Sequence, residues 1–160
     1  MSAKRGFHFP IYKHVGKCQT AQSLVEFALT LPLLLLILLG AVDLGRVFNA
    51  SVAITNASRE AARYGMSNLD DTTGIKARAI EEAAGSGVTL TPSNIVIQCY
   101  ISGAWGNCLD GSGNPLAHNG YQLRVTVNYT FSFVSLYIFK SGNIQLSDYT
   151  IMAVTGGLTE

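Results

Sequence analysis

An apolar run near the start is the most prominent pattern in the sequence. Between Leu24 and Val42 the only charged residue is Glu26. A helix rises about 1.5 Å per residue, so this run would be roughly 28 Å long, which nearly matches a hydrocarbon core of about 30 Å. The pattern predicts a membrane-spanning helix over residues 24–42, with one carboxylate near its entrance.

Helical periodicity continues beyond the apolar run. Apolar and small residues recur at three- and four-residue spacings up to Tyr64, and Gly65 is suited to end a helix. We therefore expect one helix over residues 22–65, whose part from residue 43 to 65 lies outside the membrane. Pro32 falls within the membrane part, where helices tolerate proline if neighbouring groups satisfy the freed backbone.

The second half of the chain changes from helical to alternating periodicity. Asp70 and Asp71 precede a short helical pattern over residues 75–84, which either acid could cap. Alternation of apolar and polar residues then predicts strands over residues 95–101, 121–133 and 144–154. The last of these changes register near Ser147 and Asp148, which predicts a β-bulge.

Together the elements predict an α+β fold. A small antiparallel sheet of three or four strands would rest on the outer half of the long helix, because this packing buries the apolar faces of both. In the strand over residues 121–133 one face is apolar and the other polar, so one face should pack and the other should meet water.

Charge predicts how the chain is oriented. Four basic residues precede the apolar run and no acid precedes Glu26: Lys4, Arg5, Lys13 and Lys17. By the positive-inside rule, residues 1–21 form a cytoplasmic leader and the chain beyond residue 42 is translocated. Residues 66–160 would then form an extracytoplasmic domain. The alternative, a cleaved secretory signal, is less favoured because the only small-x-small pattern after the run is Gly40-x-Val42.

Composition argues against several classes of function. A net charge of +1 and the absence of a basic stripe give no support for a nucleic-acid partner. Neither a catalytic constellation nor a cluster of metal ligands is evident, so we expect a protein that is not an enzyme and has no metal or other cofactor.

The three cysteines divide between the two predicted compartments. Cys99 and Cys108 would both be extracytoplasmic, and a disulfide between them would close the loop around a turn at Ser102 and Gly103. Two free thiols are the alternative. Cys18 would lie on the reducing side, where it is either an incidental thiol or a site of acylation.

Glu26 lies four residues after Gln22, a spacing that resembles the type IV pilin plan. In such filaments a prepilin peptidase removes a basic leader, and the carboxylate of the fifth residue neutralises the new amine of the first. Here Gln22 would be the first residue, Glu26 the fifth and Phe27 the sixth. Ala21 replaces the glycine that usually precedes the cut. Because alanine is also small, we expect cleavage before Gln22; the alternative is an anchored subunit that keeps its leader.

Two blocks carry a closer resemblance. Residues 22–46 contain Gln-Ser-Leu-Val-Glu-Phe, then Leu-Pro, a leucine block and Gly-x-x-Asp-x-Gly-Arg; residues 56–65 read Asn-Ala-Ser-Arg-Glu-Ala-Ala-Arg-Tyr-Gly. Both are similar to the TadE-like family. The resemblance implies a pilin-like minor pilin or pseudopilin of the bacterial tight-adherence (Flp) pilus, with the membrane, other pilins, the Tad assembly machinery and prepilin peptidase as partners, in secretion, adhesion or biofilm formation.

One rival function stays open from the sequence. The translocated domain could be an anchored adhesin or carbohydrate-binding module that uses Trp105, in the loop closed by the cysteines. The apolar stretch over residues 136–139 would either join the core or dock on a membrane or partner.

Overall fold

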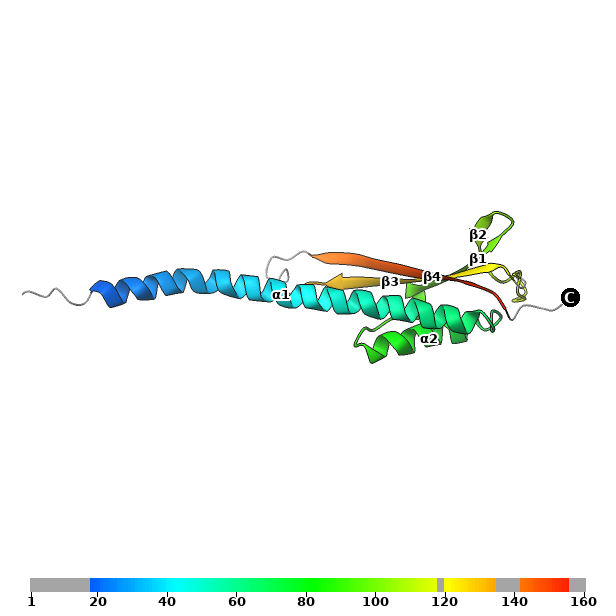
Figure 1. Ribbon diagram of the computed structural model, residues 1–160, viewed down its shortest axis with the longest axis horizontal. Helices are drawn as coiled ribbons and strands as arrows, with labels where there is room; N and C mark the ends of the chain where they lie inside the picture. The colour runs from blue at the N-terminus through cyan, green and yellow to red at the C-terminus, as the bar shows by residue number, and fades with distance from the viewer. Residues whose placement is uncertain (1–17, 118–119, 135–141, 156–160) are drawn as a thin grey trace, which may run out of the picture. The chain divides into compact units, whose positions relative to one another are not determined.

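The computed structural model describes residues 18–117, 120–134 and 142–155. The predicted leader before residue 18 and the apolar stretch over residues 136–139 lie outside this part. Two helices and four strands follow one another along the chain (Figure 1): α1 (Cys18–Gly65), α2 (Thr72–Gly85), β1 (Ile95–Ile101), β2 (Ala104–Gly106), β3 (Gln122–Ser132) and β4 (Asn143–Ala153), with a short 3-10 helix, η1 (Pro92–Asn94), before β1. The predicted α+β fold is confirmed.

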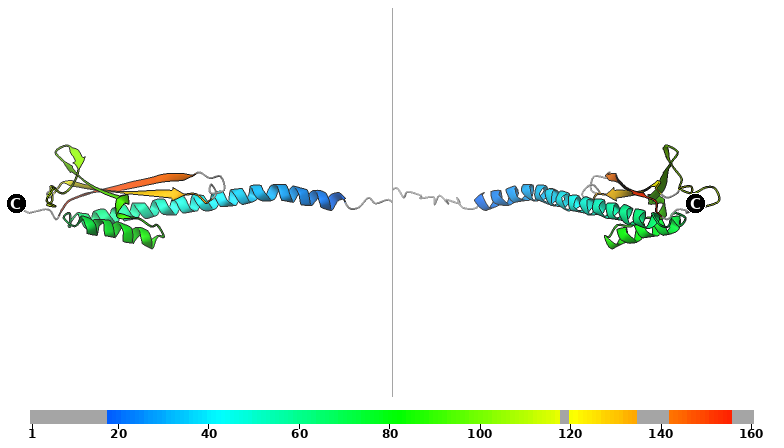
Figure 2. Two further views of the ribbon diagram at one scale, coloured as in Figure 1. Left: turned by 180° about the vertical axis from the view of Figure 1, so that it is seen from behind. Right: turned by 45° about the vertical axis from the view of Figure 1, so that its right-hand side comes forward.

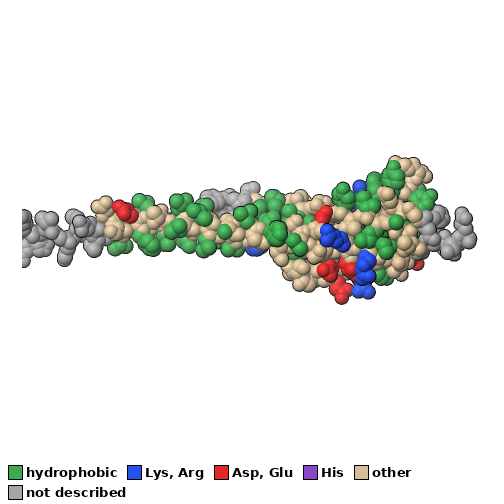
Figure 3. Space-filling view, viewed as in Figure 1, with side chains coloured by type: hydrophobic (Ala, Val, Ile, Leu, Met, Phe, Trp, Pro, Cys, Tyr) green, Lys and Arg blue, Asp and Glu red, His purple; other side chains and the backbone are tan. Residues whose placement is uncertain are grey.

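The chain forms two compact units, one up to Leu38 and one from Leu39 onward. In the first unit, every side chain of α1 from Gln22 onward is exposed, although most are apolar. On the face seen in Figure 3, hydrophobic side chains cover most of this part of the helix. α1 is long and apolar enough to cross a membrane, so an environment other than water is expected around its first half.

In the second unit, four antiparallel strands form one sheet in the order β2-β1-β3-β4. β1 and β2 are joined by a two-residue turn in which Ser102 and Gly103 have φ angles of 53° and 89°. Two positive φ angles are typical of the type I′ turn, whose twist matches that of the strands. Figure 2 shows the sheet from two further sides, with α2 and the C-terminal part of α1 beneath it.

The core lies between the sheet and the two helices. β3 contributes Leu123, Val125 and Val127, each with no exposed surface. The helices contribute mostly small side chains, which let helix and sheet approach closely: Ala50, Ala53, Ala57, Ala61 and Ala62 of α1, and Ala79 and Ala83 of α2. The predicted face of the strand over residues 121–133 is therefore the packed one.

The predicted bulge in the last strand is wrong. β3 and β4 pair without interruption from Gln122↔Ala153 to Ser132↔Asn143. The apparent change of register arises because polar Asp148 and Thr150 face the helix, where hydroxyl groups of α1 contact them. Tyr149 and Ile151 consequently face away from the core, on the outer side of the sheet.

Element ends follow local chemistry. Asp71 caps α2, as its carboxylate accepts a hydrogen bond of 2.8 Å from the Gly74 backbone N–H. Gly65 ends α1 where the sheet comes closest: a Cβ atom at this position would lie 2.7 Å from Leu123 Cδ2 and 3.0 Å from Ile75 Cδ1. Glycine at residue 65 is thus required by packing.

Candidate functional site

The predicted processing and assembly residues lie at the start of α1. Ala21, Gln22, Glu26 and Phe27 all belong to the helix, and Pro32 follows within it. The side-chain amide of Gln22 donates a hydrogen bond of 3.3 Å to Glu26 Oε1. Residues four apart are neighbours on one helix face, so a group attached to Gln22 can reach the Glu26 carboxylate.

Glu26 lies on a helix whose exposed side chains are mostly apolar, and among the described residues it has no cation beside it. Leu24, Val25 and Phe27 are 59–69% exposed, and within the described residues the first basic side chain after Glu26 is that of Arg46. No salt bridge in the described part of the chain involves Glu26. If this face lies in lipid, the carboxylate requires a partner from outside the described residues, because an unpaired charge in an apolar medium is costly.

Asp43 is the second carboxylate of α1, and its environment differs. Its side chain is 3% exposed and accepts a hydrogen bond of 3.0 Å from Arg46 Nη1. The backbone N–H of Val134, just after β3, donates to the same oxygen at 3.1 Å. Arg46 also lies over the Phe131 ring, 5.0 Å from its centroid. Asp43 thereby fastens the end of β3 to α1 where the second unit begins.

The block over residues 56–65 proves to be mainly a packing motif. Ala57, Ser58, Ala61 and Ala62 have no exposed surface. The Ser58 hydroxyl lies 2.8 Å from that of Thr150 on β4, within hydrogen-bonding distance. The small residues of the block therefore face the sheet.

The charged residues of the same block lie toward solvent. Arg63 and Glu60 form an ion pair of 2.6 Å, and the hydrogen bond from Arg63 lowers the pKa of the Glu60 carboxyl. Arg59 is exposed and takes part in no salt bridge within the described residues. These groups face away from the core, as the sequence pattern indicates.

A comparison with known protein families matches one part of the chain. A model of the family described as TadE-like protein matches residues 21–63. The chain carries a TadE-like segment. The match confirms the resemblance read from the sequence over these residues. No curated protein and no solved structure matches the chain.

The TadE-like segment contains all three carboxylates of α1, those of Glu26, Asp43 and Glu60, and most of the packing block. It begins one residue before Gln22 and ends just before Tyr64. Immediately after it, the Tyr64 hydroxyl donates a hydrogen bond of 2.9 Å to Asp71 Oδ2, and the Arg78 guanidinium lies 5.5 Å from the Tyr64 ring centroid. Hydrogen bonds from Gly74 N–H and the Tyr64 hydroxyl lower the pKa of Asp71. This junction connects the TadE-like segment to α2.

A disulfide joins Cys99 on β1 to Cys108, with their Cα atoms 5.0 Å apart. It closes the hairpin that carries Trp105. The Trp105 ring lies 5.2 Å from that of Tyr100, measured between centroids, and 4.1 Å from the guanidinium carbon of Arg124 on β3.

The sequence singled out Trp105 but not Arg124 or Tyr149, which lie beside it on the outer face of the sheet. Arg124 is 5.9 Å from the Tyr149 ring centroid. Uninterrupted alternation along β4 would have placed Tyr149 outward. The prediction of a bulge concealed that signal.

Proposed function

We propose that the protein is a non-catalytic, membrane-anchored minor pilin or pseudopilin subunit of a Tad (Flp) type pilus. The observation that carries this proposal is Glu26, a carboxylate with no cationic partner among the described residues, on an apolar exposed helix within the TadE-like segment. A plain membrane anchor has no use for an acid in this position, because a carboxylate in lipid is destabilising.

Processing by a prepilin peptidase would supply the missing partner. Cleavage between Ala21 and Gln22 creates an amine on Gln22, one helical turn from Glu26. The hydrogen bond between the Gln22 side chain and Glu26 shows that the two residues are within reach of each other. The amine of the same chain, or of a neighbouring subunit, then neutralises the carboxylate during assembly, since a buried charge is tolerated when paired.

The arrangement in the membrane follows from the same helix. Residues 24–42 span the cytoplasmic membrane of a bacterium with the N-terminus inside, and residues 43–65 continue outward. Residues 66–160 form the extracytoplasmic part, in the periplasm or at the cell surface. There the sheet and α2 are available to other pilins and to the assembly machinery.

The mature N-terminus tests this proposal directly. We expect mass spectrometry of the protein purified from membranes of its pilus-producing host to find a chain beginning at Gln22. Replacing Ala21 with leucine, a larger residue beside the scissile bond, should block processing, whereas Ala21→Gly should preserve it. A chain that retains residues 1–21 in cells with active prepilin peptidase would contradict the pilin assignment and favour a simple anchor.

A further inference from the structure

The outer face of the sheet is unusually rich in exposed rings and amides. Tyr149 is 58% exposed, Tyr100 40%, Val96 41% and Ile151 42%. Cross-strand pairing brings these residues together, because Val96 pairs with Thr126 and Thr126 with Tyr149, while Gln98, Arg124 and Ile151 form the next row. Side-chain amides lie on the same face: Gln98 is in the row between the two rings, Gln122 pairs with Tyr100, and Asn128 and Gln145 lie in the rows beyond Tyr149.

Arg124 lies at the centre of this surface and has no carboxylate partner among the described residues. Its only hydrogen bond within the described residues runs from Nη2 to Gln98 Oε1, at 2.5 Å, and its buried Nε–H has no acceptor there. The single acid in the four strands, Asp148, faces α1, where the Thr55 hydroxyl donates to it. The outer face of the strands therefore carries one positive charge and no negative charge.

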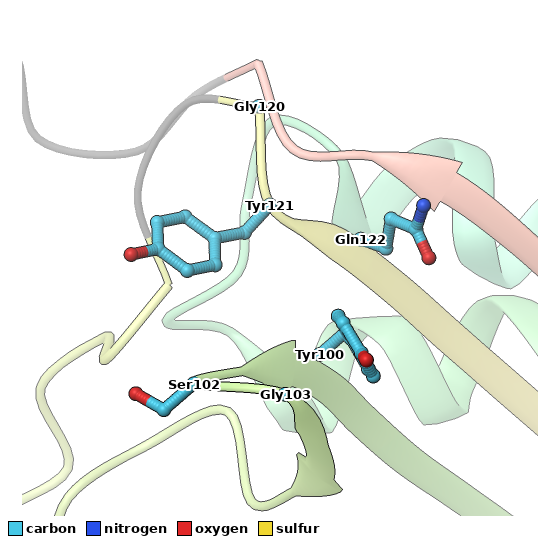
Figure 4. Close-up of a pocket in the computed structure, with 6 residues that line it drawn as sticks. All are labelled: Tyr100, Ser102, Gly103, Gly120, Tyr121 and Gln122. Carbon is cyan, nitrogen blue, oxygen red and sulfur yellow. The ribbon is translucent and has the colours of Figure 1, made fainter.

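A pocket of about 470 Å³ adjoins the surface, at the place where the β1–β3 ladder ends (Figure 4). Tyr121 and Gln122 form one wall at the start of β3, and Tyr100 and Ser102 form the other at the β1–β2 turn. The volume falls within the range of about 300–1,000 Å³ that is typical of small-ligand sites. Its described lining combines two phenol rings with an amide and a hydroxyl, and has no charged side chain.

The hairpin beside the pocket is held in place before any ligand arrives. The disulfide fixes Cys99, next to Tyr100, to Cys108, and Trp105 packs on Arg124. A pre-formed surface loses little conformational entropy on binding.

We propose that this outer surface binds an anionic glycan. Sugar rings stack on Tyr100 and Tyr149, a terminal or branching unit enters the pocket, and a sugar carboxylate pairs with Arg124. Two observations favour a glycan over a protein partner: the open pocket has the volume of a small-ligand site, and polar Gln98 and Arg124 interrupt the apolar surface between Tyr100 and Tyr149. The inference goes beyond assembly of a pilus, since it concerns what the subunit contacts outside the cell.

Titration of the full-length protein in detergent micelles with an oligogalacturonate of defined length tests the proposal. We expect saturable binding that weakens at least about tenfold in Tyr149→Ala, which removes a stacking ring, and in Arg124→Gln, which removes the cation. Arg124→Lys should retain part of the affinity. Two variants serve as matched controls, Phe48→Ala for an exposed ring and Arg59→Gln for an exposed cation, both on α1; neither should change the affinity.

Comparison ligands decide between glycan recognition and charge alone. A neutral cello-oligosaccharide of the same length should bind more weakly, and polyglutamate should not compete. Equal binding of polyglutamate or of the neutral sugar would overturn the proposal, as would unchanged affinity in folded Tyr149→Ala. If Tyr149→Ala alters only the oligomeric state, the surface serves another protein and the glycan proposal is wrong. None of these results depends on whether the leader is cleaved or pili assemble.

Discussion

The two halves of α1 lie in different environments. Before Leu39 the described side chains are exposed and mostly apolar, whereas from Asp43 onward one face of the helix is buried against the sheet through alanines. The carboxylates follow the same division. Among the described residues, Glu26 is exposed and has no cation beside it, whereas Asp43 is buried and accepts hydrogen bonds from Arg46 and from the Val134 N–H.

The second half of α1 therefore contributes to folding of the protein, and the first half contributes to contacts with its surroundings. The second half of α1 already has its partner, the sheet of the same chain. The first half presents apolar surface that no described part of the chain covers, so we expect lipid or neighbouring helices to supply the contacts. Substitutions in one half should therefore alter stability, and substitutions in the other should alter assembly.

The largest expected effect is on Glu26. Glu26→Gln should abolish incorporation into pili, because removing one member of an ion pair in an apolar medium costs about 3–5 kcal/mol. The melting temperature should not change, since within the described residues the Glu26 side chain contacts only Gln22. Immunoblots of sheared pili and of whole cells measure incorporation, and thermal unfolding of the purified protein in detergent measures the melting temperature.

Thr30→Val is the matched control for this position. The Thr30 hydroxyl lies on the same part of α1 but donates only to the backbone carbonyls of Glu26 and Phe27. The Thr30→Val variant should be incorporated into pili as the wild type is. Normal pili in the Glu26→Gln strain would remove the main support for the pilin assignment.

The next effect concerns packing in the second half of α1. Ala61 has no exposed surface, so Ala61→Leu should destabilise the protein by about 3 kcal/mol through overpacking. Leu34→Ala, at a residue that is 59% exposed in the first half, should leave the melting temperature in detergent unchanged. Thermal unfolding of Ala61→Leu and Leu34→Ala, monitored by circular dichroism, tests this prediction. Equal shifts in both variants would show that the two halves of α1 do not differ in this way.

A smaller loss is expected at Asp43. Asp43→Ala removes the acceptor for Arg46 and for the Val134 backbone N–H, and should lower the free energy of unfolding by about 2 kcal/mol. The free energy of unfolding of Asp43→Asn should lie between those of Asp43→Ala and the wild type, because an amide oxygen can still accept one of these bonds. Glu82→Ala, which removes an exposed acid from α2, is the control. An unchanged free energy of unfolding in Asp43→Ala would mean that the hydrogen bonds of Asp43 do not stabilise the protein.

Periodicity was sufficient to predict most of the fold. The three longer strands begin and end within one residue of the predicted positions, and the long helix ends at Gly65 as expected. The helix begins at Cys18, before the predicted start at residue 22. Local signals succeed here because apolar alternation and helix-ending residues act through neighbours in the sequence.

Tertiary contacts account for what the sequence did not predict. Asp43 follows directly after the predicted membrane span, yet its carboxylate is buried and accepts a hydrogen bond from the N–H of Val134, 91 residues away. Asp148 and Thr150 resembled a change of register because their partners, Thr55 and Ser58, belong to α1. No local pattern encodes such pairs, so Arg124 and Tyr149 were missed along with them.

The smallest expected effect is a pH dependence at the N-cap of α2, which the sequence did predict. Folding lowers the pKa of Asp71, mainly through the Gly74 N–H and then through the Tyr64 hydroxyl. A carboxyl whose folded pKa is depressed stabilises the protein above its unfolded pKa, and this contribution disappears as the pH falls through the folded value. The melting temperature should therefore fall with acidification below about pH 4, near the ordinary aspartate pKa.

Asp71→Asn isolates this contribution from that of Asp110, whose pKa is also lowered, by backbone N–H groups of its own turn. Asparagine can still cap the helix but does not titrate, so the variant should lose less stability on acidification than the wild type. Differential scanning fluorimetry between about pH 6 and pH 2.5 measures the two slopes. Parallel slopes would show that the junction after the TadE-like segment gains nothing from the charge of Asp71, and that the hydrogen bonds to Gly74 and Tyr64 act as neutral ones.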